Sequence, residues 1–262
     1  MPEPRPQSIP VFLLVKGAFQ TVWRQRDDAL RLGLVPTLIY FGALLLGSDA
    51  MFAFGDHVRT AGVGQMPPPG VLGTILMTIL IGTVAACLMI ANWLRFMLLG
   101  PMGAVGVGIA IGPPQLSFVV ASIVLLFVSG IVGSVAFMPV ALLLTGALAG
   151  IGAVAIAIAV VVVAVRLSPF LVALAVAQPL TLQQAWAASR GNGISVALAL
   201  FLAQVPFWVG ANLLTGLLGA IGFASAAPVA MLFIIAVFEV ASAVVQANVL
   251  AAAFRHMVGI KV

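Results

Sequence analysis

The sequence predicts an all-α membrane protein, a polytopic bundle of six transmembrane helices with further helices at the cytoplasmic interface. Hydrophobic residues make up 63% of the 262 residues and charged residues only 6%, whereas a soluble domain carries about 25% charged residues. The apolar runs are also much longer than the core helices of soluble proteins. Composition and run length together therefore exclude a soluble fold.

The expected organisation is a short tail followed by one membrane domain. Residues 1–8 are rich in proline, which predicts a disordered tail, and residues 9–262 form the membrane domain. Within this domain, residues 9–31 predict an amphipathic interfacial helix, because apolar residues recur at helical spacing and charged residues fall elsewhere. The apolar stripe of this helix consists of Val11, Leu14, Val15, Ala18 and Val22.

Six apolar segments follow, each long enough to cross about 30 Å of hydrocarbon. The predicted spans occupy residues 32–54, 71–94, 115–138, 146–165, 194–218 and 228–254. A polar loop over 55–70 separates the first two spans. Residues 115–165 carry no charge and are divided into two spans by a turn near Pro139 to Gly150. Residues 96–114 are rich in Gly and Pro and form either a surface loop or a re-entrant segment.

A second interfacial helix is expected at 180–190, on the cytoplasmic side between spans four and five. Thr181 is a residue type that commonly caps the start of a helix. The Gly191-Asn192-Gly193 sequence then provides a stop signal before span five.

The basic residues predict the orientation in the membrane. An even number of spans places both termini on the same side, and with this count only Arg59 falls outside. The positive-inside rule therefore predicts that both termini lie in the cytoplasm. The cytoplasmic set is Arg5, Lys16, Arg24, Arg26, Arg31, Arg95, Arg166, Arg190, Arg255 and Lys261. Because these charges are scattered at the ends of spans, no nucleic-acid partner is expected.

Some of these basic residues are candidates for contacts with anionic lipid headgroups, at about 1 kcal/mol per cation. The alternative is that they only orient and solubilise the chain. The candidates, with one interfacial tryptophan, are Arg24, Arg26, Arg31, Arg95, Arg166, Trp186 and Arg190.

A stripe of polar residues is expected inside the membrane. Glu239 lies among apolar residues of span six, and Glu239, Ser242 and Gln246 share one face of that helix. Gln204 and Asn212 share one face of span five. Counting about 1.5 Å per residue matches their depths, which predicts the pairs Gln204–Gln246 and Asn212–Glu239. The stripe is either interhelical glue, at about 0.6 kcal/mol per pair, or a polar pathway or headgroup site with Glu239 binding a proton or cation.

No catalytic signature is present, so we expect no enzyme, catalytic residue or cofactor. Gly-x-Ser-x-Gly, His-Glu-x-x-His, Walker and Rossmann patterns are absent from the sequence. Two histidines and one cysteine, Cys87, are too few for a common zinc site. Asp49, Asp56 and His57 are either a solvated surface or a loose site for a divalent metal; we expect the former and predict no metal site.

Two segments resemble uncharacterised α-proteobacterial membrane proteins. Asn92-Trp93-Leu94-Arg95-Phe96-Met97-Leu98-Leu99-Gly100 resembles a Trp-His-Arg-Phe-x-Leu-Leu-Gly-Glu pattern. Arg166-Leu167-Ser168 with Ala185-Trp186-Ala187-Ala188-Ser189-Arg190-Gly191-Asn192 resembles the loop between spans four and five of the same group. That group is similar to the YciC-like family and to the membrane domain fused to some glycerophosphodiester phosphodiesterases. The resemblance implies a six-helix inner-membrane module without assigned chemistry, because the soluble phosphodiesterase domain is absent. Leu94 and Pro101 replace the His and Glu of the pattern.

The sequence therefore predicts a non-enzymatic inner-membrane module associated with lipids or the cell envelope. The alternative is a small secondary transporter or channel that uses the polar stripe around Glu239. Membrane lipids are the expected partners, and a membrane-protein partner or a second copy of the chain remains open.

Overall fold

The computed structural model describes residues 9–61, 67–100, 111–143 and 147–258, and this part of the chain is helical without a strand. Six of its helical segments are long and apolar enough to cross a membrane, so the protein is a multi-pass all-α membrane protein. The elements are α1 (Val11–Arg24), α2 (Arg26–Ala61), α3 (Pro69–Leu99), α4 (Pro113–Leu143), α5 (Ala147–Arg166), α6 (Ser168–Ala175), α7 (Leu182–Ala188), α8 (Gly193–Ala220), α9 (Phe223–Ala226) and α10 (Pro228–Val258).

The first span is longer at both ends than the sequence predicts. The amphipathic helix α1 ends at Arg24, and after the single non-helical residue Gln25 the charged segment 26–31 belongs to α2. Asp27 and Asp28 stabilise this start, because carboxylates favour the positive end of the helix dipole. Residues 55–61, predicted as loop, continue α2, and the Thr60 hydroxyl donates to the Asp56 carbonyl oxygen at 2.8 Å.

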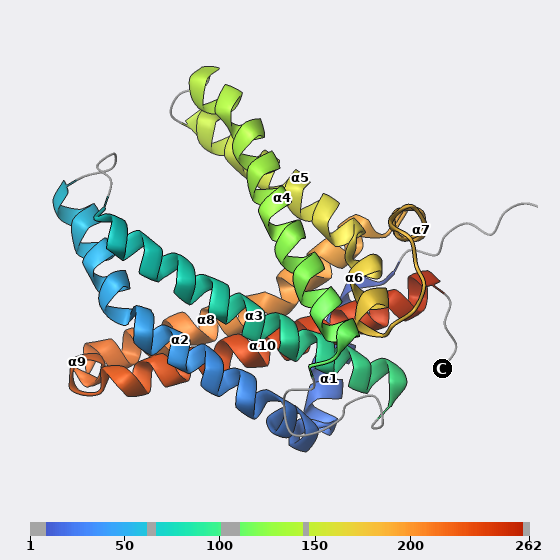
Figure 1. Ribbon diagram of the computed structural model, residues 1–262, viewed down its shortest axis with the longest axis horizontal. Coiled ribbons are helices and arrows are strands. Elements are labelled where there is room, and N and C mark those ends of the chain that lie inside the picture. Colours follow the sequence, from blue (N-terminus) through green and yellow to red (C-terminus); the bar gives the residue numbers. More distant parts are fainter. Residues whose placement is uncertain (1–8, 62–66, 101–110, 144–146, 259–262) are drawn as a thin grey trace, which may run out of the picture.

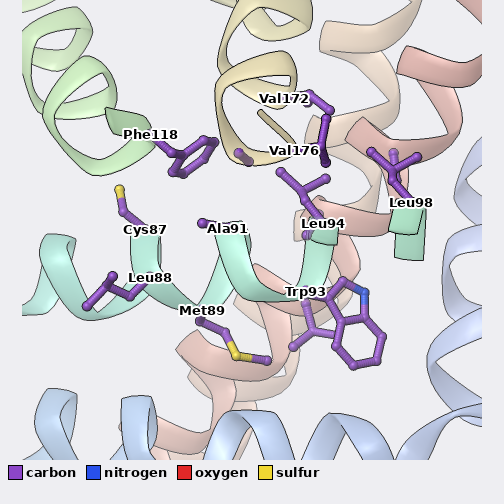
Figure 2. Close-up of a cluster of buried hydrophobic side chains, with 14 of the residues drawn as sticks. Cys87, Leu88, Met89, Ala91, Trp93, Leu94, Leu98, Phe118, Val172 and Val176 are labelled. Carbon is purple, nitrogen blue, oxygen red and sulfur yellow. The ribbon is translucent and has the colours of Figure 1, made fainter. Parts of the chain in front are cut away.

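Helix α3 lies at the centre of the bundle, with neighbours on opposite faces. Figure 2 shows Cys87, Ala91 and Leu94 pointing toward Phe118 of α4 and toward α6, while Met89 and Trp93 point the other way. Met89 and Trp93 are completely buried. A helix that is apolar on all sides is expected in such a position.

Helices α2 and α3 pack closely because glycines leave room for larger side chains. A Cβ atom at Gly47 would lie 2.1 Å from Thr78 Oγ1, and one at Gly82 would lie 2.8 Å from Cε2 of Tyr40. In lipid, small residues at helix interfaces allow backbones to approach and gain dispersion contacts. These two contacts therefore set the separation of α2 and α3.

Helices α4 and α5 form a hairpin that projects away from the other long helices (Figure 1). Its base packs on α3 and α6, and Gln115 Nε2 of α4 donates to Asn92 Oδ1 of α3 at 3.3 Å. Helix α4 ends at Leu143 and α5 begins at Ala147, so the connection falls in the predicted range of 139–150.

Helix α1 packs with its apolar stripe against the bundle. Ala18 is buried against α8 and α10, and the rings of Phe19 and Phe207 stack 5.9 Å apart. Outside this stripe, Phe12 and Trp23 of α1 are exposed. The stripe predicted to face the membrane interface therefore contacts protein, and a second set of apolar side chains is available for lipid.

The connection between spans four and five contains a helix, α7, within the range predicted for the second interfacial helix. Thr181 caps α7: its hydroxyl accepts from the Gln184 N–H, while the Gln184 side chain accepts from the Thr181 N–H. Gly191 then adopts a φ of 84°, in the left-handed region that favours glycine. The predictions for 1–8, 101–110, Gly146 and Lys261 lie outside the described residues.

Candidate functional site

The inner part of the polar stripe forms a closed network between α8 and α10. Gln246 Nε2 donates to Gln204 Oε1 at 2.6 Å and to Ser242 Oγ at 3.1 Å. The Ser242 hydroxyl also donates to Gln204 Oε1. The predicted pair Gln204–Gln246 is therefore present, and these side chains satisfy one another across the helix interface.

The predicted pair Asn212–Glu239 does not form. Asn212 Nδ2 donates instead to the Trp208 carbonyl oxygen of its own helix, at 2.7 Å. At this level of the interface Phe238 faces α8, since a Cβ atom at Gly210 would lie 3.2 Å from the Phe238 ring. Because Phe238 faces α8, the next residue, Glu239, is turned toward α2 and α3. The depth of a residue in the membrane does not define this rotation of α10.

Glu239 lines a cavity of about 290 Å³ between α2, α3 and α10. The hydroxyl-bearing residues Tyr40, Thr78 and Thr83 line the same cavity, together with Cys87 and apolar side chains. Glu239 forms no hydrogen bond or ion pair with the residues that the structure describes. An unpaired intramembrane carboxylate beside a cavity is therefore a candidate site.

Two of the predicted headgroup arginines are engaged within the protein. Arg95 Nη1 donates to the Ala175 carbonyl oxygen at the end of α6, at 2.9 Å. The Arg166 guanidinium lies 3.7 Å from the centre of the Trp186 ring and donates to the Trp186 carbonyl oxygen at 3.2 Å. The position of Arg166 also explains why residue 193 is a glycine, because a Cβ atom at Gly193 would lie 2.6 Å from Arg166 Cγ. Arg95, Arg166 and Trp186 thus hold the helix ends together.

The other predicted headgroup residues, Arg24, Arg26, Arg31 and Arg190, are exposed. Arg26 differs from the other three because it lines an apolar groove between α2 and α10 with a volume of about 420 Å³. The Arg26 guanidinium also lies 5.7 Å from the centre of the exposed Trp23 ring.

The groove runs lengthwise between two antiparallel helices. A Cβ atom at Gly33 would lie 3.4 Å from Val240, while the rings of Phe41 and Phe233 meet edge to face at 5.4 Å. From Arg26 to Leu38 the lining follows α2 for about 18 Å, at about 1.5 Å per residue. One membrane leaflet has a hydrocarbon depth of about 15 Å, half of about 30 Å. The groove is therefore about as long as one leaflet is deep.

Sequence reasoning missed the polar contact buried most deeply in the bundle. Trp93 Nε1 donates to Asn248 Oδ1 at 3.1 Å, and the two side chains are 0% and 3% exposed. The available signal was an asparagine within an apolar run, two positions beyond Gln246. Trp23 was not among the predicted headgroup residues, although it is exposed and tryptophan is typical of membrane interfaces.

No group of three or more His, Cys, Asp or Glu side chains in the described ranges could hold a metal ion. Asp49, Asp56 and His57 lie along α2, and Asp56 Oδ1 approaches Arg59 Nη1 at 3.9 Å on the exposed surface. Comparison with protein-family models, curated proteins and solved structures finds no match.

Proposed function

We propose that the protein is a non-enzymatic inner-membrane protein that binds an anionic lipid, with both termini in the cytoplasm. The groove between α2 and α10 carries this proposal. It would hold one acyl chain along Leu30, Leu34 and Leu38, with the lipid phosphate beside Arg26. The apolar lining suits the acyl chain of the lipid, and the Arg26 guanidinium at one end suits its anionic headgroup.

The position of Trp23 supports a headgroup at this end of the groove. Trp23 is 74% exposed, and its amphipathic ring is of the type that gathers at the level of lipid headgroups. Because the Arg26 guanidinium lies over this ring, the cation and the aromatic side chain share one level. The groove then extends from that level into the hydrocarbon.

Neighbouring carboxylates weaken the positive field but do not cancel it. Arg26 Nε lies 3.9 Å from Asp27 Oδ1, and the two side chains are 64% and 95% exposed. Exposed ion pairs contribute about 0–1 kcal/mol and are screened by salt, so Arg26 can exchange Asp27 for a phosphate at small cost. Arg24 and Arg31 offset Asp28 and keep this end of α2 cationic.

The alternative, transport through the polar stripe, has less support. A pathway needs polar groups that are open to water or substrate. Gln204, Ser242 and Gln246 instead bond to one another, which favours the interpretation of this part as interhelical glue.

Lipid titration of the purified protein, followed by native mass spectrometry, tests the proposal. We expect one phosphatidylglycerol to bind more tightly than phosphatidylcholine. Arg26→Gln should weaken phosphatidylglycerol binding about fivefold, since a cation near an anionic lipid contributes about 1 kcal/mol. Ala241→Phe, which places a ring in the groove, should weaken the binding of both lipids.

Arg24→Gln is the matched control, because Arg24 is exposed nearby but does not line the groove. It should bind phosphatidylglycerol like the wild type. Unchanged affinity in both Arg26→Gln and Ala241→Phe would refute the groove as the lipid site.

A further inference from the structure

The cavity beside Glu239 points to a second ligand, separate from the proposed lipid. Its lining comes from α2, α3 and α10, and none of its residues lines the groove that contains Arg26. The two sites therefore lie on different sides of the contact between α2 and α10. Because they share no lining residue, binding at the cavity and binding at the groove can be tested independently.

The charge of the expected ligand follows from Glu239. A carboxylate in a membrane helix is costly unless a partner or a wet cavity compensates it. Glu239 has neither a hydrogen bond nor an ion pair among the described residues, and it is an exposed residue that lines the cavity. A cationic ligand would supply the missing partner.

The size and lining of the cavity fit an organic ligand better than a bare metal ion. Divalent metals take several oxygen ligands, often carboxylates, and Glu239 is the single acid in the lining. The volume of about 290 Å³ is far larger than the space that one water molecule needs. Most of the remaining lining is apolar, including Ala43, Leu44 and Ile79, so a ligand with a hydrocarbon body fits better.

Tyr40 gives the site a second feature that suits an organic cation. The Tyr40 ring is held against α3 at Gly82, where a Cβ atom would lie 2.8 Å from the ring. The same residue lines the cavity together with Glu239 of α10. Aromatic faces attract ammonium groups, and quaternary ammonium ligands are commonly recognised in this way.

We propose that this cavity binds an organic ammonium cation, with the positive charge between Glu239 and the Tyr40 ring and the apolar body against α2 and α3. Thr78 and Thr83, which carry hydroxyl groups, also line the cavity. The Thr78 hydroxyl already donates to the Thr74 carbonyl oxygen at 2.9 Å, so its oxygen remains available as an acceptor.

Calorimetric titration of the detergent-solubilised protein tests this proposal with two probes of the same shape. Phenyltrimethylammonium carries the charge, and tert-butylbenzene is its uncharged carbon counterpart. The wild-type protein should bind the cation about tenfold or more tightly than the neutral probe, a difference large enough to resolve. Equal binding of the two probes, or no binding of the cation, overturns the proposal whatever the variants do.

Variants then locate the charge. Glu239→Gln should lose about tenfold in affinity for phenyltrimethylammonium, while Tyr40→Phe, which keeps the ring, should retain most of it. Asp49→Asn is the matched control, because Asp49 is an exposed carboxylate on α2 outside the cavity lining. Gel filtration checks that each variant is folded. Wild-type affinity in folded Glu239→Gln contradicts the assignment.

Discussion

The central bundle and the α4–α5 hairpin are both strongly apolar, yet they are packed in opposite ways. In the bundle, Trp93 and Leu94 of α3 are 0% exposed and Phe254 of α10 is 1% exposed. In the hairpin, the most apolar stretch of the span Leu148–Ala175 contains no buried residue. The hairpin also projects away from the other helices (Figure 1). Apolar composition thus identifies both as membrane segments but does not distinguish protein-facing from lipid-facing helices.

Two kinds of contact distinguish the bundle from the part of the hairpin that projects beyond its base. The bundle contains buried polar pairs between helices, such as Trp93–Asn248, and glycines in close contact, such as Gly47 against Thr78. Within the hairpin, a Cβ atom at Gly133 would meet Val160 at an ordinary 3.8 Å, and Gly130 and Gly150 have open space around them. Since lipid solvates apolar side chains as well as protein does, specific packing must come from fit and hydrogen bonds.

The largest effect is expected when matched leucines are shortened in the two regions. Leu94→Ala should lower the free energy of unfolding by about 2 kcal/mol, the low end of the range for soluble cores. The variant loses packing contacts, but moving a leucine from protein to lipid involves little hydrophobic free energy. Leu148→Ala, at a side chain that is 60% exposed on the hairpin, should change it by less than about 0.5 kcal/mol. Reversible unfolding in mixed micelles measures both. Equal losses would mean that the hairpin is packed as tightly as the bundle.

A smaller effect is expected from adding one methyl group at glycines. Gly47→Ala places a carbon where Thr78 Oγ1 lies 2.1 Å away, and the resulting overpacking should cost about 1–2 kcal/mol in the free energy of unfolding. Gly130→Ala on the hairpin and Gly42→Ala on α2 have open space and should cause no loss. Thermal unfolding of the three purified variants provides the comparison. A stable Gly47→Ala variant would show that α2 and α3 are not held at this separation.

The smallest effect concerns matched asparagines. Asn248→Ala leaves the buried Trp93 indole N–H without its acceptor, which should cost about 1 kcal/mol of unfolding free energy. Asn212→Ala removes only a bond to the carbonyl oxygen of its own helix at an exposed position and should be nearly neutral. Denaturant titration of both variants separates them, and a neutral Asn248→Ala would mean that the buried bond does not stabilise the bundle.

Much of the fold could be predicted from the sequence, because membrane spans depend on the length and polarity of single segments. The six spans follow from apolar runs, and the start of α7 follows from Thr181 and its local capping. The boundary at Gln25 could not be predicted in this way. The charged segment 26–31 is compatible with either an interfacial helix or the first turns of a span, and only tertiary contacts decide.

The candidate sites were less predictable, because they depend on helix rotation and on contacts between distant segments. The pair Gln204–Gln246 followed from matched depth in neighbouring spans. Glu239 was placed on the correct helix but toward the wrong neighbour, since matched depth does not define helix rotation, and one residue along α10 changes the direction of a side chain by about 100°. Arg95 and Arg166 turn inward to carbonyl oxygens and a ring, which positional rules for charged residues do not foresee.

The proposed lipid site is tested most directly by native mass spectrometry of the wild-type protein and of Arg26→Gln, each extracted gently from its own membrane. We predict that the wild-type ion retains one anionic lipid under collisional activation and that Arg26→Gln loses most of this occupancy. Arg24→Gln should retain it. A wild-type ion free of lipid, or equal retention of lipid by the wild-type protein and Arg26→Gln, would contradict the assignment of the groove as an anionic-lipid site.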